Sequence, residues 1–426
     1  MAGFIENLRS EHSANAARFG SKAANQARLG LAGLPIPEGF CLDAEAYRQQ
    51  LAAVGLLNLT KRIAGLSGEE ERQAVSEIRI GLFDSPITPE VETPLLQAWS
   101  ELRQSTGSTI VVRSSALSED LADSTFAGQY ETFLDLATEA EFLTAVRACW
   151  AALWSPRALR YMQSRDLSTK DMAMSLCIQE LVGGEISGGG MSRLADGNMS
   201  ISASLGLGTA IAQGEIVPDR YILSASNELL ETIVGRTSHQ ENCSRHSSTS
   251  RSVGASTTQQ PCLSPAQSVE LGHLLKIAEK QMGFPVEIEW TGNKQKIWLL
   301  QARPLQMIAS VLQHDAALKQ SGLRGQPSGT GWASGRACVI NCECELARVA
   351  PGDVLVTQVA SPSLSQILPR VAGVIAELGG STSHLASLAR ERQIPMVLGV
   401  LGATQRIPDG VDVSVDGVIG QVSWSR

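Results

Sequence analysis

The sequence lacks any long apolar run, and its opening residues, MAGFIENLRSEHS, contain no apolar leader. A membrane-spanning helix needs roughly twenty apolar residues in succession, and a secretory leader needs an apolar central region. We therefore expect no membrane partner and a cytoplasmic location. Positive charge is also in deficit, with 35 basic against 43 acidic residues and a net charge of −8. Because such a chain repels a phosphate backbone, nucleic acid is not an expected partner.

Histidine is absent from the neighbourhood of the one group of cysteines, Cys338, Cys342 and Cys344. The group also lacks the spacing of a zinc knuckle, so it does not indicate a metal site. Reduced structural thiols are the expected state of these cysteines in a cytosolic protein.

The chain is rich in apolar side chains and in glycine, with 43% hydrophobic residues and 39 glycines in 426 residues. This length and composition support buried cores in two or three domains. Many of the glycines fall in short clusters, which indicate tight backbone approaches rather than disorder.

Residue patterns predict a first domain over 1–308 that mixes helices and strands. The expected helices cover residues 16–34, 144–164 and 266–282, and the expected strands cover 108–113, 175–181, 285–290 and 296–300. Residues 237–260 are rich in Ser, Thr and Gln and nearly free of large apolar side chains. They cannot bury much surface, which predicts a mobile loop within this domain.

A second domain is predicted over 329–426, after a linker over 309–328. In this linker a predicted short helix over 310–319 runs into SGLRGQPSGTG, where Gly, Pro and Ser dominate. Short strand-like segments alternate in the second domain with a single clear helix over 383–393. The expected strands cover residues 336–340, 354–357, 373–376, 396–398 and 411–415. This alternation predicts a compact α/β domain.

The strongest chemical signal is His384, which follows two glycines and a Ser/Thr cluster in ELGGSTSHLA. An apolar strand ends at the glycines, and the histidine lies in the first turn of the next helix. A helix N-terminus carries partial positive charge and favours an anion, so this imidazole suits a nucleophile that becomes phosphorylated. The same pattern also fits a surface histidine beside a helix cap.

Two cations and several glycines in the first domain suit a polyanion. Lys22 lies in FGSKAAN, and Arg113 follows the apolar strand segment in VVRSS. Glycines over 187–190 and 206–208 could let the backbone approach phosphates. Taken singly, such cations are more often solvated or ion-paired side chains, and the glycines fit ordinary turns.

A third set combines acidic and basic side chains on two predicted strands, VEIEW and the segment ending in LLQARP. Strand alternation places Glu287 and Glu289 on one face, and Gln301 on the adjacent strand adds an oxygen ligand suited to Mg²⁺. Arg303 can hold a terminal phosphate through two hydrogen bonds. Together with Lys22, these residues favour a magnesium–nucleotide site over an exposed strand face with charge pairs.

These motifs resemble, almost end to end, the pyruvate phosphate dikinase and phosphoenolpyruvate synthase family, which includes rifampicin phosphotransferase. FGSKAANQARL, AGLPIPEGF and TIVVRSSALSEDLADSTFAGQYETFLDL are similar to the start of its ATP-binding domain. SASLGLGTAIAQGEIVPDRY and VEIEWTGNKQKIWLLQARPL are similar to the later segments of that domain. GTGWASGRA, PGDVLVT, GGSTSHLASLARERQIPMVLGV and VDGVIGQV resemble the swivelling phosphohistidine domain.

The resemblance implies an ATP-grasp fold followed by a small swivelling α/β domain. Lys22, Arg113 and Arg303 would contact the phosphates of ATP, and Glu289 and Gln301 would be the Mg²⁺ ligands, with Glu287 beside them. Gln179, Glu180 and Leu181 would hold the adenine. His384 would take a pyrophosphoryl group from ATP, lose the terminal phosphate to water or phosphate, and keep the other.

The sequence departs from the family in showing no acceptor-substrate domain, either after the phosphohistidine domain or between the two domains. The acceptor is therefore open. A small molecule could bind between the two domains of a complete biosynthetic kinase or ATP-driven condensing enzyme. A separate acceptor-domain protein could complete a split system, or the chain could be a phosphohistidine carrier with a protein acceptor. Since imidazole attacks only when unprotonated, activity is expected to fall below roughly pH 6.5.

Overall fold

The computed structural model describes residues 3–118, 130–163, 167–169, 172–206, 208–235, 260–293, 295–306 and 322–424. They form two compact units, and each unit combines two stretches of chain. Unit 1 is Met1–Gly184 with Ile277–Pro304, and unit 2 is Glu185–Lys276 with Leu305–Arg426. The predicted mobile loop over 237–260 lies outside the described residues except for Gln260, and most of the predicted linker over 309–328 does as well. The domain boundary near that linker stays a prediction.

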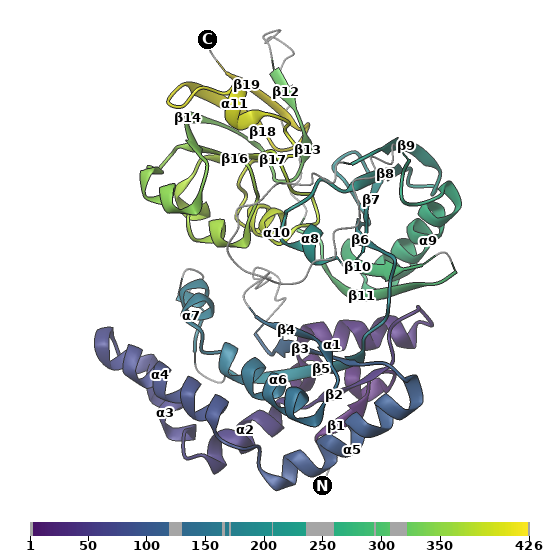
Figure 1. The fold of residues 1–426 in the computed structure, drawn as a ribbon, viewed down its shortest axis with the longest axis vertical. Helices are drawn as coiled ribbons and strands as arrows, with labels where there is room; N and C mark the ends of the chain where they lie inside the picture. Colours follow the sequence, from purple (N-terminus) through teal and green to yellow (C-terminus); the bar gives the residue numbers. More distant parts are fainter. Residues whose placement is uncertain are drawn as a thin grey trace. The chain divides into compact units, whose positions relative to one another are not determined.

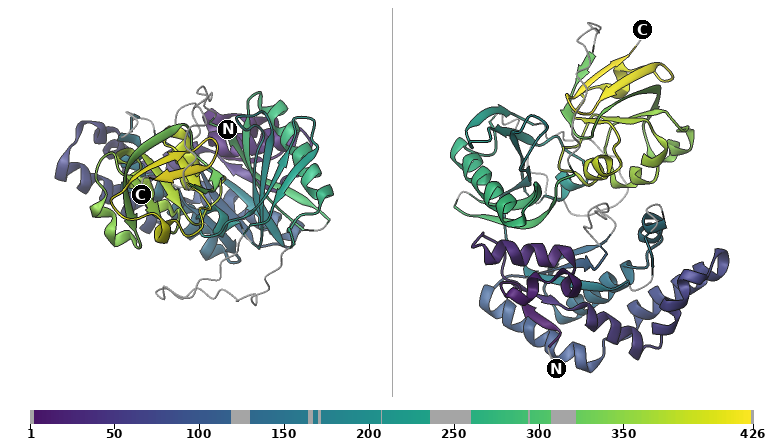
Figure 2. Two further views of the ribbon diagram at one scale, coloured as in Figure 1. Left: turned by 90° about the horizontal axis from the view of Figure 1, so that it is seen from above. Right: turned by 180° about the vertical axis from the view of Figure 1, so that it is seen from behind.

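Unit 1 contains an antiparallel sheet in the order β1-β2-β5-β3-β4, with helices packed around it (Figure 1). The strands are β1 (Ile5–Asn7), β2 (Gly39–Leu42), β3 (Ile110–Ala116), β4 (Thr132–Leu136) and β5 (Met174–Glu180). The helices are α1 (Ala16–Leu31), α2 (Ala44–Ala53), α3 (Leu57–Arg62), α4 (Gly68–Asp84), α5 (Pro89–Thr106), α6 (Glu139–Ala152) and α7 (Pro156–Gln163). Figure 2 shows the same helices from behind.

The helix predicted over 144–164 is two helices, α6 and α7. The chain leaves the helical path before Pro156, because proline lacks a backbone N–H and disfavours a helical residue before it. Trp150 and Trp154 are both buried, and the indole N–H of Trp154 donates to the hydroxyl of Tyr47 at 2.7 Å. The predicted apolar side is therefore correct although the single helix is wrong.

The second stretch of unit 1 carries a hairpin of β10 (Val286–Gly292) and β11 (Ile297–Pro304). It follows α9 (Pro265–Met282), which spans the boundary between the two units. The backbone N–H of Leu299 in β11 donates to the carbonyl of Pro35 at 2.7 Å, which ties the hairpin to the first stretch of the unit.

Unit 2 contains two groups of strands. The first is an antiparallel series in chain order, and α8 (Thr209–Ala212) lies between its second and third strands. Its strands are β6 (Ile186–Met191), β7 (Met199–Leu205), β8 (Asp219–Leu223) and β9 (Leu229–Ile233).

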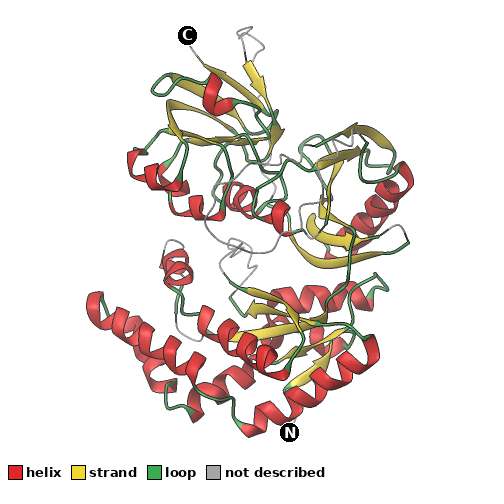
Figure 3. Ribbon diagram, viewed as in Figure 1, coloured by secondary structure: helices red, strands yellow, loops and turns green. Residues whose placement is uncertain are grey.

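The second group in unit 2 is a mixed sheet whose described strands run in the order β12-β19-β18-β14-β15-β16-β17-β13, with β14 to β17 parallel to one another. These strands are β12 (Gly322–Arg324), β13 (Gln326–Pro327), β14 (Trp332–Ile340), β15 (Val354–Thr357), β16 (Gly373–Ala376), β17 (Met396–Leu398), β18 (Asp412–Asp416) and β19 (Gln421–Trp424). The helices α10 (His384–Glu391) and α11 (Ala403–Arg406) accompany them (Figure 3). Buried aliphatic side chains such as Val356, Ile375 and Val397 form the core.

Two smaller observations complete the fold. Cys342 and Cys344 form a disulfide, so the prediction of reduced thiols is wrong for this pair, whereas Cys338 is a free, buried thiol. No helix in the described part of the chain is long and apolar enough to cross a membrane.

Candidate active site

The hairpin β10–β11 brings the predicted acidic, amide and basic side chains face to face. In its antiparallel register, Glu287 lies opposite Arg303 and Glu289 lies opposite Gln301. Strand alternation places Glu287 and Glu289 on one face, as the sequence predicts, because the register shift comes only after Glu289. Two carboxylates, an amide and a guanidinium are thus collected on neighbouring strands of one unit.

Both carboxylates of this hairpin form ion pairs with arginine side chains. Arg303 pairs with Glu287 at 3.2 Å, with only 7% and 4% of the two side chains exposed. Arg113 on β3 pairs with Glu289 at 3.2 Å and also donates to the carbonyl of Leu300 on β11. The guanidinium groups suit phosphate oxygens, and the carboxylate and amide oxygens suit a hard divalent cation. The cluster can therefore receive an anion and a cation side by side.

Lys22 is positioned by a kink in α1. Gly20 has a φ of 71° inside the helix, and a Cβ there would overlap the carbonyl of Ser115 on β3. The hydroxyl of Ser115 donates to the carbonyl of Phe19 at 2.7 Å and accepts the N–H of Ala23 at 3.1 Å. Only glycine adopts this conformation readily at such a close approach. The kink fixes the turn that carries Lys22 against the strand that carries Arg113.

The positive charge of Lys22 also affects the pKa of Cys149 on α6. Burial raises the pKa of the Cys149 thiol, the charge of Glu131 raises it further, and the positive charge of Lys22 acts in the opposite direction. Lys22, on α1, is therefore near enough to Cys149 on α6 for its charge to act on that thiol, and it lies in the same unit as Arg113.

Two side chains of α1 fix it to β11. Asn25 donates from its amide nitrogen to the carbonyl of Ala302 at 3.2 Å, and Gln26 donates to the carbonyl of Leu299 at 2.6 Å. Both amides are buried. Because Ala302 lies between Gln301 and Arg303, these bonds hold the lysine-bearing helix beside the strand that carries those two side chains.

The residues predicted to hold adenine lie at the end of β5, next to β3. Gln179 is 2% exposed, and its amide nitrogen has no hydrogen-bond partner among the described residues. A buried donor of this kind favours a ligand with a ring acceptor, since leaving it unpaired costs free energy. Glu180 accepts the N–H of Glu38 at 3.0 Å, and the N–H of Leu181 donates to Thr109. Gln179 is thus the member of this group best suited to a ring nitrogen.

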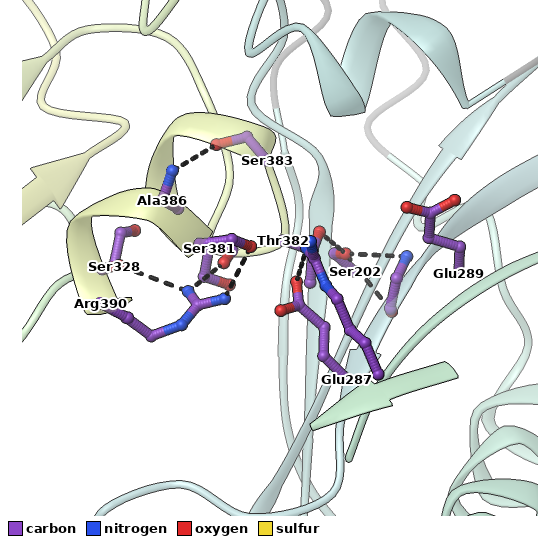
Figure 4. A network of polar contacts seen from close by, with 12 residues as sticks. Ser202, Glu287, Glu289, Ser328, Ser381, Thr382, Ser383, Ala386 and Arg390 are labelled. Carbon is purple, nitrogen blue, oxygen red and sulfur yellow. Dashed lines mark hydrogen bonds and ion pairs between the residues drawn. The ribbon is translucent and has the colours of Figure 1, made fainter. Parts of the chain in front are cut away.

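His384 is the first residue of α10 in unit 2. The N-cap is Ser383, which is buried and whose hydroxyl accepts the N–H of Ala386 at 3.3 Å (Figure 4). The N–H of Ser383 in turn donates to the carbonyl of Gly380 at 3.0 Å, which closes the turn between β16 and α10. The partly exposed imidazole therefore lies at the positive end of a helix, directly after a turn whose backbone is held by hydrogen bonds.

Arg390 holds this loop from the far end of α10. Its guanidinium is buried and donates to the carbonyl of Ser381 at 2.6 Å and to the hydroxyl of Ser387 at 3.1 Å (Figure 4). It also reaches the carbonyl of Ser328 at 3.4 Å. A buried cation with these bonds orders the backbone just before His384.

Comparison with known proteins decides the family. Residues 16–321 match the model of the pyruvate phosphate dikinase AMP/ATP-binding domain, and residues 349–420 match that of the PEP-utilising enzyme mobile domain. The chain belongs to the pyruvate phosphate dikinase family. The predicted resemblance is confirmed, and so is the predicted fold class of an ATP-grasp-like domain followed by a small α/β domain.

Curated relatives of this family extend the match. The chain is 30% identical to a probable phosphoenolpyruvate synthase of Archaeoglobus fulgidus, over 96% of this chain and 56% of the relative. It is 31% identical to the phosphoenolpyruvate synthase of Aeropyrum pernix, over 95% and 56%. It is 29% identical to that of Escherichia coli, over 92% and 53%. The chain spans about half the length of the curated relatives that it matches.

In this dikinase-family chain, the predicted site residues divide between the two matched domains. The nucleotide set lies within the AMP/ATP-binding match, and His384 lies within the mobile-domain match. The first match supports ATP as a ligand of this chain.

Three residues that organise the site escaped prediction. Ser115 lies two positions after Arg113 on the same strand, so the two side chains share one face of it. This alternation is the signal that could have identified Ser115. Gln26 carries no local signal, because its partner lies in β11, more than two hundred residues along the chain. Arg390 lies in the last turn of a mostly apolar helix, and its charge among apolar neighbours is the only signal that the sequence offers.

Proposed function

We propose that this chain transfers a phosphoryl group from ATP to its own His384 and then to a small-molecule acceptor. An imidazole nitrogen of His384 attacks the β-phosphorus of ATP, forms a P–N bond and expels AMP as the α–β bridging bond breaks. Water or phosphate then removes the terminal phosphoryl group, leaving phosphohistidine with phosphate or pyrophosphate as the by-product. The charges of Lys22, Arg113 and Arg303 would stabilise the developing negative charge, and Gln179, Glu180 and Leu181 would border the adenine.

The observation that carries this proposal is the joint occurrence of a capped helix-terminal histidine and a charged nucleotide cluster in one chain. His384 begins α10 behind Ser383, and the register of β10–β11 sets Glu289 against Gln301 and Glu287 against Arg303. A nucleophile alone fits many functions, whereas a nucleophile with a phosphate-binding partner domain favours phosphoryl transfer.

The residues present also fit Mg²⁺. Glu289 and Gln301 offer a carboxylate and an amide oxygen from directly opposed positions, which is the oxygen chemistry that Mg²⁺ prefers. When bound with ATP, the cation would neutralise phosphate charge. The pairing of Arg113 with Glu289 keeps that carboxylate oriented toward the same cluster.

The test is labelling with ATP that carries ³²P at the β-position. Wild-type protein is expected to acquire label that acid releases and base does not, and His384→Ala is expected to lose it completely. His273→Ala, at an exposed histidine on α9, serves as the matched control and should label normally. Circular dichroism would establish that each variant is folded. Retention of acid-labile label by folded His384→Ala protein would refute the proposal.

The acceptor can be approached through turnover. A single burst of AMP, equal to the enzyme present, indicates that an acceptor must be added, whereas continuous AMP release indicates that water accepts the group. Phosphoenolpyruvate, the compound in the relatives' names, is the first to test in reverse: ³²P-phosphoenolpyruvate should label His384 if this chain shares that chemistry. Failure of reverse labelling would move the search to other small molecules or to a separate acceptor protein.

A further inference from the structure

Gly189 lies in the cluster of three glycines on β6, and its open side faces a threonine rather than open space. A Cβ built on Gly189 would lie 2.6, 2.7 and 2.8 Å from the Cβ, Cγ2 and Oγ1 atoms of Thr382. Its three nearest neighbours therefore all belong to this one side chain. Real Cβ atoms do not approach other atoms so closely, so any larger residue at 189 would have to displace Thr382. The glycine serves a close contact between two segments of the chain.

Ser202 completes this contact from the adjacent strand. It lies opposite Gly189 in the β6–β7 register, and its hydroxyl accepts the N–H of Gly189 at 3.1 Å. The same hydroxyl lies 2.8 Å from the hydroxyl of Thr382, with either one able to donate (Figure 4). Ser202 is only 3% exposed. One strand thus supplies the space and the other supplies the polar partner.

The loop that holds Thr382 makes further contacts beside this one. The N–H of Gly379 donates to the carbonyl of Ile216 at 3.2 Å, and a Cβ on Gly380 would lie 2.8 Å from the ring of Pro218. Thr382 stands two residues before His384. The contact therefore holds the backbone that directly precedes the nucleophile.

The contact between Ser202 and Thr382 joins the two matched domains. Gly189 and Ser202 lie in the AMP/ATP-binding match, whereas Thr382 lies in the mobile-domain match. We propose that Gly189 and Ser202 form a seat for Thr382 that holds the His384 loop on the ATP-binding domain while His384 accepts its phosphoryl group. This inference rests on the proposed function. Gly189 and Ser202 are positioning residues, since they act through Thr382 and touch no reacting atom.

The first test is steric. Gly189→Ala should slow the labelling of His384 by tenfold or more while the Kd for ATP stays within twofold, because the added methyl meets Thr382 first. In a Thr382→Gly background the same substitution should have almost no further effect, since all three clashing atoms are gone. Gly183→Ala is the matched control, because Gly183 has no atom within 4 Å of its Cβ position and should label at the wild-type rate.

The second test needs no activity. Ser202→Cys with Thr382→Cys places sulfur atoms where hydroxyls now lie 2.8 Å apart, and mild oxidation should link the two peptides in the intact chain. Mass spectrometry would identify the linked pair, and each single variant is the control. Reduction should restore labelling of His384.

The outcomes separate the two proposals. Absence of the cross-link, or wild-type labelling by Gly189→Ala, would overturn the seat even though His384 is phosphorylated. A cross-link in a protein that never labels His384 would retain the contact but overturn the proposed function, and with it the role of the seat in phosphoryl transfer.

Discussion

At the scale of single residues, the proposed nucleotide site contains a buried ion pair, Arg303 with Glu287. Arg303 and Glu287 are almost completely enclosed, whereas Arg9 and Glu38 form a pair at the same 3.2 Å separation with 38% and 51% of their side chains exposed. Buried charges lose their hydration and depend on one another, while exposed charges remain solvated. The two ion pairs have the same separation, but the free energy lost on breaking the buried pair should be larger.

The first prediction compares these two pairs. Glu287→Ala should lower the free energy of unfolding by about 3–5 kcal/mol, because it removes the carboxylate that faces a buried guanidinium. Glu38→Ala, the matched control on the surface, should cost about 0–1 kcal/mol. Urea unfolding at neutral pH measures both. Equal losses in the two variants would contradict the burial of the first pair.

A double substitution at Glu287 and Arg303 separates the effect of this ion pair on stability from its effect on the labelling of His384. Glu287→Leu with Arg303→Met removes both charges and should recover most of the stability lost in the single variant, since apolar residues of similar volume can replace a buried ion pair. Labelling of His384 should nevertheless remain at least tenfold below wild type, because the proposed contact of Arg303 with the phosphates is gone. Full labelling by the stable double variant would show that Arg303 has no role at the phosphates.

Residues whose position on a strand follows from the neighbouring sequence could be predicted. Glu287, Glu289 and Gln301 were placed correctly because strand alternation is a local rule. The partner of Thr382 could not be predicted in this way, since Ser202 and Gly189 lie far from it in sequence and meet it only through tertiary packing. The sequence leaves the glycine cluster that contains Gly189 open between a phosphate approach and an ordinary turn, and the structure places the side chain of Thr382 against Gly189.

At the scale of elements, α6 begins with a capping box. The hydroxyl of Thr138 accepts the N–H of Glu141 at 3.3 Å, and the carboxylate of Glu141 accepts the N–H groups of Thr138 and Ala137 at 2.9 and 3.0 Å. The backbone N–H of Thr138 lowers the pKa of Glu141 most, followed by the Thr138 side chain and the N–H of Ala137. The ionised carboxylate is therefore the form that stabilises the helix start.

The second prediction follows from the direction of that shift. A carboxyl whose pKa is lowered on folding adds stability above its unfolded pKa and loses it as pH falls through the folded value. Glu141→Gln should therefore be less stable than wild type at pH 7, and the difference should shrink as pH falls below roughly 4.3. Urea unfolding at a series of pH values measures this, with Glu139→Gln in the same turn as the control. A difference that stays constant with pH would exclude the ionised cap.

Elements with strong local signals were predicted closely. The strands expected over 354–357, 373–376 and 396–398 have those bounds as β15, β16 and β17, because each is a short apolar run between turn residues. The start of α6 was misplaced although its cap motif was present, since the apolar pattern was followed and the T-x-x-E signal at Thr138 was not. Short strands such as β13 depend on partners in the sheet and carry little signal of their own.

At the scale of the whole molecule, unit 1 is assembled from two stretches separated by ninety-odd residues of unit 2. Hydrogen bonds from Asn25 and Gln26 to β11 join the first stretch to the second. No sequence pattern reveals such a connection, because loop closure over this distance depends on the complete fold. Arg113 of β3 meets Glu289 of β10 only through this assembly.

The last prediction tests that assembly through ligand-linked stability. A ligand that binds only the folded state at about 100 times its Kd adds about 2.7 kcal/mol, and for a domain of this order of size about 2–4 °C accompanies each kcal/mol. ATP with Mg²⁺ should therefore raise the unfolding temperature by about 5–10 °C. Lys22→Met should abolish most of this shift, because its charge is proposed to contact the phosphates. His384→Ala should retain it, since the proposed nucleophile is not needed for ATP binding.

Lys61→Met is the matched control, because Lys61 is an exposed lysine on α3 of the same unit. Differential scanning fluorimetry with and without nucleotide gives the shift for each variant, and the difference cancels any change in intrinsic stability. If the shift survived in Lys22→Met but vanished in Lys61→Met, the nucleotide would have to bind elsewhere in unit 1. Loss of the shift in His384→Ala would instead mean that the mobile domain contributes to ATP binding. That outcome would contradict the predicted division of the site residues between the two matched domains.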